Sequence, residues 1–107
     1  MRALIGSLFF LMISAQAVAA GDTGKVVEYY AHPDGHVAIR LDGGLPGANA
    51  VNNCGTTANQ WAGVDPTVDP SMKAALLTAK ASGSTVLLVT LGRCVGGWIK
   101  IEAMHIR

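Results

Sequence analysis

The chain has 107 residues, half of them hydrophobic, with eight basic and seven acidic side chains. This near-neutral balance argues against nucleic acid or an anionic membrane as the partner, because both require a surplus of Lys and Arg on one face. The sequence also contains no phosphate-binding loop and no nucleophile motif, so we expect neither an enzyme nor a cofactor.

Residues 1–20 have the three-part layout of a secretory signal peptide. A short basic start precedes an apolar run that is too short to span a bilayer, and small residues follow it. Cleavage after Ala19 or after Ala20 satisfies the small-residue rule, and we expect it after Ala20. The predicted product, residues 21–107, is one secreted or periplasmic domain of about 87 residues with no membrane anchor.

The exported domain is predicted to begin with a β-hairpin. Residues 25–31 are rich in strand formers, and residues 37–42 alternate apolar and polar side chains, which is typical of a half-buried antiparallel strand. The Pro-Asp-Gly sequence between them predicts a turn. His32 and His36 flank this turn and could face each other to bind a metal ion, but a tetrahedral site needs further ligands. We therefore interpret them as exposed turn residues.

The middle of the domain has weaker local signals. Residues 43–50 have the composition of a loop, and residues 51–54 are compatible with a short strand. Residues 57–68 contain proline breaks and predict an irregular crossing or a short strand that leads into a helix.

The clearest signal is a helix over residues 69–83. Asp69 can cap the first free N–H groups, Pro70 suits the first helical position, and Gly83 supplies a left-handed stop. One apolar stripe is expected to cover the sheet, namely Met72, Ala75, Leu76 and Ala79. A second stripe on the opposite side is either simply exposed or a contact between copies of the chain in a homo-oligomer: Ala74, Leu77 and Ala81.

Two strands are predicted after the helix. Residues 85–91 form an apolar, β-branched run, residues 92–97 form a turn, and residues 98–107 form the last strand. The alternation of the last strand slips, which predicts a β-bulge near Ala103 or Met104. The fold class expected is therefore α+β, a small antiparallel sheet or partly open barrel of about five strands, with one helix before the last two strands.

Cys54 and Cys94 are the two cysteines of the chain. In an exported protein such a pair is most simply a disulfide, and its spacing does not match a redox or thiolate metal site. A loop of this length would be worth roughly 4 kcal/mol of stability in the chain-entropy model, which matters in so small a domain.

The run from Met72 to Gly83, followed by a strand and Gly92-Arg93-Cys94, with Cys54 and Trp61 upstream, resembles small exported bacterial proteins. The layout also resembles the receptor-binding B subunits of AB5 toxins, particularly the subtilase-cytotoxin type. That resemblance implies an oligomer-binding (OB) fold with a helix between its third and fourth strands, and a role in binding. It assigns no sugar-contacting residue to this sequence.

Four aromatic residues remain after the predicted signal peptide: Tyr29, Tyr30, Trp61 and Trp98. Their rings could stack on a sugar face, or the two Trp residues could simply cap the core. Tyr29 and Tyr30 are adjacent in a strand and must point to opposite sides of the sheet. The candidate ligand-binding residues are Tyr29, Tyr30 and Trp61.

Two functions follow from these features. The first is a non-enzymatic, glycan-binding protein that resembles a toxin B subunit. The alternative is a periplasmic inhibitor or accessory protein that binds a partner protein through an apolar patch or through the loop at residues 43–49.

Overall fold

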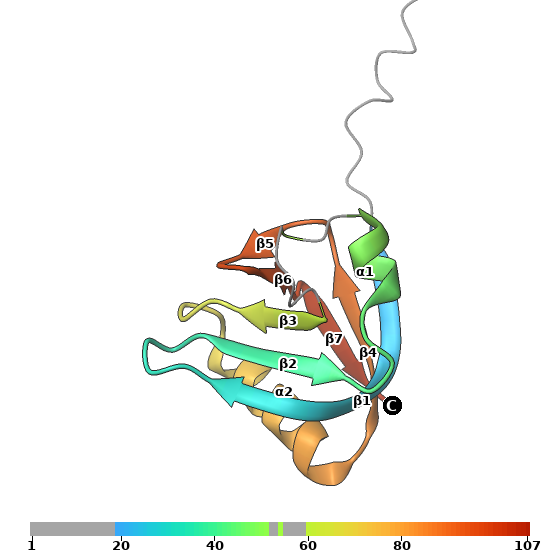
Figure 1. Cartoon of the computed structure of the whole chain (residues 1–107). Coiled ribbons are helices and arrows are strands. Elements are labelled where there is room, and N and C mark those ends of the chain that lie inside the picture. The colour runs from blue at the N-terminus through green and yellow to red at the C-terminus, as the bar shows by residue number, and fades with distance from the viewer. Residues whose placement is uncertain (1–18, 52–53, 55–59) are drawn as a thin grey trace, which may run out of the picture.

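The computed structural model describes residues 19–51, 54 and 60–107 (Figure 1). The predicted signal peptide therefore lies outside the described residues except for its last two positions, as do parts of the predicted strand at 51–54 and crossing at 57–68. Within the described ranges the chain forms a seven-stranded, mostly antiparallel sheet and two helices. The strands are β1 (Ala20–Ala31), β2 (Val37–Leu41), β3 (Trp61–Val64), β4 (Thr85–Thr90), β5 (Cys94–Val95), β6 (Trp98–Lys100) and β7 (Ala103–Ile106), and the helices are α1 (Pro46–Val51) and α2 (Pro70–Ser82).

The predicted α+β class is confirmed. The sequence predicted about five strands and one helix, and the described chain has more of both. The extra helix is α1. The extra strands arise because the turn at residues 92–97 contains the short strand β5, and because the last predicted strand divides into β6 and β7. Helix α2 consequently precedes four short strands rather than two.

The sheet has the order β5-β6-β3-β2-β1-β4-β7. Strand β1 pairs with β4 through its first half and with β2 through its second half. Strands β3 and β6 are parallel, while β4 and β7 are antiparallel. Two residues connect β6 to β7: Ile101 donates its N–H to the Gly63 carbonyl at 2.9 Å, and Glu102 donates to the Val89 carbonyl at 2.9 Å. The continuous segment that contains β6 and β7 therefore pairs with β3 toward one end of the strand order and with β4 toward the other.

The change of partner at Ile101 and Glu102 explains the slipped alternation of the last strand. Ile99 and Ile101 are buried, whereas Met104 takes up the inward phase again opposite the buried Leu88. The sequence predicted an irregularity near Ala103 or Met104. The structure places it at Ile101 and Glu102, because this is where the chain leaves β3 and joins β4.

Helix α2 forms where the sequence predicts it. Asp69 Oδ1 accepts a hydrogen bond from the Ser71 N–H at 2.8 Å, and Gly83 ends the helix with φ of 68°. Leu76 and Ala79 are fully buried, and Met72 packs against the same core. The helix lies across one face of the curved sheet (Figure 1), and no helix among the described residues is long and apolar enough to cross a membrane.

The predicted disulfide is present. Cys54 and Cys94 are bonded, with their Cα atoms 5.7 Å apart and a separation of 40 residues in sequence. The bond ties the segment that follows α1 to β5. It therefore fixes the start of the β5–β6 hairpin, which carries Trp98.

Helix α1 corrects the prediction of a loop at residues 43–50 and of a strand beginning at Val51. Its first turn is held by Asp22 of β1, whose carboxylate accepts the N–H of Gly47 at 2.7 Å and that of Ala48 at 2.9 Å. Asp22 is 5% exposed, and Leu45 and Ala48 are buried. A capping residue supplied from 25 positions earlier leaves no local signal in the sequence.

Replacing Asp22 by Ala should lower the free energy of unfolding by about 2 kcal/mol, because two N–H groups at the start of α1 lose a charged acceptor. Urea denaturation of residues 21–107 measures this loss. Asp42→Ala is the matched control, since the Asp42 carboxylate is exposed and accepts one hydrogen bond, from the Lys25 N–H at 3.1 Å. Equal losses in the two variants would contradict the role given to Asp22.

Candidate functional site

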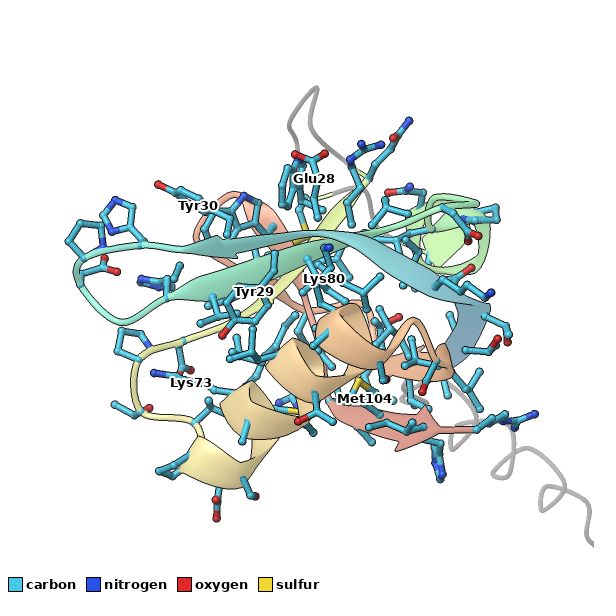
Figure 2. All side chains as sticks on the ribbon, turned by 90° about the horizontal axis from the view of Figure 1, so that it is seen from below. Glu28, Tyr29, Tyr30, Lys73, Lys80 and Met104 are labelled. Atoms are coloured by element: carbon cyan, nitrogen blue, oxygen red, sulfur yellow. A yellow bond between two sulfur atoms is a disulfide. The ribbon has the colours of Figure 1, made fainter. Side chains whose placement is uncertain are left out.

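Three of the four aromatic residues of the domain meet on the outer face of the sheet. Tyr30 of β1, Trp61 of β3 and Trp98 of β6 line a groove of about 410 Å³. Glu28 and Tyr29 also border this groove, which we call the aromatic groove. Figure 2 shows Glu28 and Tyr30 on the side of β1 that faces away from α2, whereas Tyr29 points toward the helix. Of the predicted ligand-binding residues, Tyr30 and Trp61 are thus brought together, and the Tyr29 ring instead packs against the core.

A β-bulge in β1 brings Tyr30 to the outer face. Val26 pairs with Leu41 and Glu28 pairs with Arg40, so Val27 is an extra residue without a partner on β2. Inward positions are even-numbered up to Val26 and odd-numbered from Tyr29 onward. Without the bulge, Tyr30 would point into the core. As it is, Tyr30 is 42% exposed and available to a ligand.

Small residues form the floor of the aromatic groove. Ala38 of β2 pairs with Tyr30 on one side and with Gly63 of β3 on the other. Ala38 is fully buried although it lies on the outer face, so the rings above it must cover it. A Cβ atom on Gly63 would lie 2.7 Å from Trp98 Cε3. The Trp98 ring therefore rests directly on the backbone of β3.

Edge-to-face contacts hold the rings in place. Tyr30 is central: its ring centroid lies 6.4 Å from Trp61, 6.0 Å from Trp98 and 5.9 Å from His32, at interplanar angles of 73° to 85°. His36 in turn contacts Trp98 at 6.0 Å. Such contacts stabilise a fixed arrangement of rings. Rings that are already ordered lose little conformational entropy when a ligand binds.

A pair of opposite charges borders the aromatic groove. Arg40 Nε donates to Glu28 Oε1 at 2.6 Å, and Arg40 Nη1 lies 3.5 Å from Gln60 Oε1. The Glu28 and Arg40 side chains stay substantially exposed, at 50% and 35%. Carboxylate and guanidinium groups beside apolar rings can bind hydroxyl groups while the rings contact C–H surfaces.

The turn between β1 and β2 places Asp34 between two imidazoles. Its Oδ1 lies 2.9 Å from His32 Nδ1 and its Oδ2 lies 2.9 Å from His36 Nδ1, and the His36 N–H donates to Oδ1 at 2.9 Å. The histidines thus converge on a carboxylate. Among the described residues, no group of three or more His, Cys, Asp and Glu side chains is arranged to hold a metal ion.

The hydrogen bonds around Asp34 lower its pKa to about 2, with the His36 backbone N–H as the largest cause and the two imidazoles adding to it. A carboxyl-detected NMR titration should find this midpoint, against about 3.9 in an unfolded chain. Because the folded pKa is depressed, the turn's contribution to stability is complete above about pH 4 and is lost as the pH falls through about 2. His36→Ala should raise the midpoint partway, since the backbone N–H remains, and an unchanged midpoint would contradict this assignment.

The predicted oligomer contact lies elsewhere. Ala74, Leu77 and Ala81 are exposed on α2, and Leu77 is 52% exposed. They do not join the aromatic groove. Self-association through this stripe stays a prediction.

Four residues of the site were not among the ligand-binding residues predicted from the sequence: Glu28, Arg40, Gly63 and Trp98. A signal for Gly63 existed, because a glycine inside a strand often marks the close approach of another group. Trp98 is one of the four aromatic residues that could stack on a sugar. Its position beside Trp61, which lies 37 residues earlier in the sequence, depends on the parallel pairing of β6 with β3.

Comparisons with known proteins found no matching family model, no similar curated protein and no similar solved structure. The geometry of the aromatic groove therefore carries the functional interpretation.

Proposed function

We propose that this chain is an exported, non-enzymatic domain that binds glycans through the aromatic groove. The observation that carries the proposal is the set of three ordered aromatic rings, Tyr30, Trp61 and Trp98, gathered over a floor of small residues. Amphipathic rings present an apolar surface to the C–H face of a sugar while their polar atoms stay solvated. The neighbouring Glu28 and Arg40 supply hydrogen-bonding groups for hydroxyls.

We further propose an OB-like architecture. Strand β1 pairs with both β2 and β4, β3 is parallel to β6, and β7 pairs with β4. If β6 and β7 are taken as one bent strand and β5 as an extension of the loop before it, five strands remain in a closed order, with α2 between the third and fourth. This arrangement supports the resemblance to toxin B subunits. In OB folds the face of the second and third strands binds oligonucleotides and oligosaccharides, and the aromatic groove lies over β2 and β3.

The disulfide is consistent with a periplasmic or secreted location, since such bonds persist in oxidising compartments. The charge balance of the chain favours sugars over nucleic acid as the ligand. Fold alone does not assign a function, so the proposal depends on the site.

The alternative, an inhibitor or accessory protein that binds a partner protein, has less support. One of its two predicted contacts was a projecting loop at residues 43–49, but Leu45 and Ala48 of this segment are buried and α1 begins within it. The exposed Leu77 remains the best anchor for a protein partner, and a pull-down is the test that would favour this function.

A glycan array probed with the labelled mature protein tests the proposal. The wild type should bind a defined set of glycans. Trp61→Ala should weaken this binding about 30-fold, as expected when a central aromatic anchor worth about 2 kcal/mol is removed. His105→Ala is the control, because this exposed residue of β7 lies outside the groove. Glycan binding would be overturned if the wild type bound no glycan on the array and a pull-down captured a partner protein instead.

A further inference from the structure

A second hollow, of about 220 Å³, adjoins the aromatic groove. It is lined by His32, Asp34, His36, Gly96, Gly97 and Trp98. We call it the turn hollow. Trp98 also lines the aromatic groove, so the two depressions share this indole as a common wall.

The walls of the turn hollow come from two turns that lie on the same side of the molecule, the β1–β2 turn and the turn of the β5–β6 hairpin (Figure 1). The first turn is fixed by backbone hydrogen bonds, from the His32 N–H to the His36 carbonyl at 2.8 Å and from the Gly35 N–H to the His32 carbonyl at 2.9 Å. The second turn brings two glycines without side chains, which lets a ligand approach the backbone.

Size separates the roles of the two depressions. Ligand pockets usually measure about 300 to 1,000 Å³, so the turn hollow is too small for a site of its own, whereas the aromatic groove is not. A ligand that reached across Trp98 would use both.

We propose that the turn hollow is a second sugar subsite, so that the protein binds an oligosaccharide of at least two rings that crosses Trp98. This inference rests on the proposed glycan binding. The Asp34 carboxylate accepts hydrogen bonds from sugar hydroxyls, and the imidazoles of His32 and His36 can donate or accept them. Trp98 supplies the apolar surface for both rings of the sugar chain.

The charge of the turn hollow selects neutral sugars. Asp34 presents a carboxylate that, like any exposed Asp, is ionised at neutral pH; its side chain is 51% exposed and its oxygens lie 2.9 Å from the Nδ1 atoms of His32 and His36. A ligand with a carboxylate or sulfate at this subsite would face that charge at close range. The subsite therefore takes a neutral hexose or N-acetylhexosamine in preference to an acidic sugar.

The test uses an array of neutral glycans built from glucose, galactose or N-acetylglucosamine, each printed with one, two and three rings, together with matched glycans that end in an acidic sugar. The wild type should bind the two-ring form of its preferred glycan about tenfold more tightly than the one-ring form. Asp34→Ala removes the carboxylate of the turn hollow and no ring contact of the aromatic groove, so it should abolish this gain with length and leave one-ring binding unchanged, whereas His105→Ala should change neither. His32 and His36 are left unchanged in this test, because their rings contact Tyr30 and Trp98 of the aromatic groove.

The outcomes separate this inference from the proposed function. Equal binding of one-ring and two-ring forms by the wild type, or a gain with length that survives Asp34→Ala, would overturn the turn subsite and leave glycan binding intact. If the wild type bound matched glycans with an acidic terminal sugar more tightly than the neutral ones, the preference for neutral sugars would be overturned. If the wild type bound no glycan at all, the proposed function would be overturned, and the turn subsite with it.

Discussion

Replacing both Cys54 and Cys94 by Ala should lower the free energy of unfolding by about 4 kcal/mol, because the bond closes a long loop in the unfolded chain. The two cysteines are 40 residues apart in sequence. A domain this small has only about 5 kcal/mol or somewhat more to lose, so the variant should be close to its folding threshold. Urea denaturation followed by tryptophan fluorescence measures the change.

The reduced wild type is the matched control for the cysteine variant. It lacks the bond but keeps both side chains, so its stability should agree with that of the double variant. Cys54 has φ of 49°, a left-handed conformation that strains a cysteine and an alanine alike because both have a Cβ atom, so Cys54→Ala adds no backbone cost of its own. A loss below about 1 kcal/mol on reduction would contradict the stabilising role of the bond.

Gly63→Ala should destabilise the protein by about 3 kcal/mol and displace Trp98 from the groove. The new Cβ would lie 2.7 Å from Trp98 Cε3 and 2.9 Å from the Val37 carbonyl oxygen. The ring could move, but the carbonyl belongs to the neighbouring strand β2 and cannot shift without disturbing the sheet. Near-UV circular dichroism, which reports the fixed tryptophan environment, and glycan binding should both decline.

Gly43→Ala is the matched control for this substitution. No heavy atom lies within 4 Å of a Cβ placed on Gly43, and its φ does not require glycine. Its stability and its near-UV spectrum should match those of the wild type. If Gly63→Ala behaved like Gly43→Ala, Trp98 would not rest on β3 as described.

Local signals in the sequence were sufficient for α2. Asp69, Pro70 and Gly83 act on residues only a few positions away, and all three take the roles predicted for them. Helix α1 could not be predicted in this way, because two of its N-terminal N–H groups donate hydrogen bonds to Asp22, which lies far away in sequence in β1. The sequence around Pro46 and Gly47 is typical of a loop, and only the folded sheet makes a helix favourable there.

The candidate site was predictable in part for a similar reason. Strand alternation alone required Tyr29 and Tyr30 to point to opposite faces, and the structure confirms this. Which of the two faces outward depends on the bulge at Val27, a property of the pairing between β1 and β2. The position of Trp98 depends on the return of β6 to β3, a long-range contact that no short stretch of sequence encodes.

The most direct test of the aromatic groove is an NMR titration of ¹⁵N-labelled residues 21–107 with the glycan that binds most strongly on the array. The chain contains two tryptophans, so two indole N–H signals are expected, and Trp61→Phe assigns them. Glycan binding in the groove predicts that both indole signals shift and saturate together with the signals of Tyr30. Saturation that leaves both indole signals in place while residues of α2 shift would contradict it.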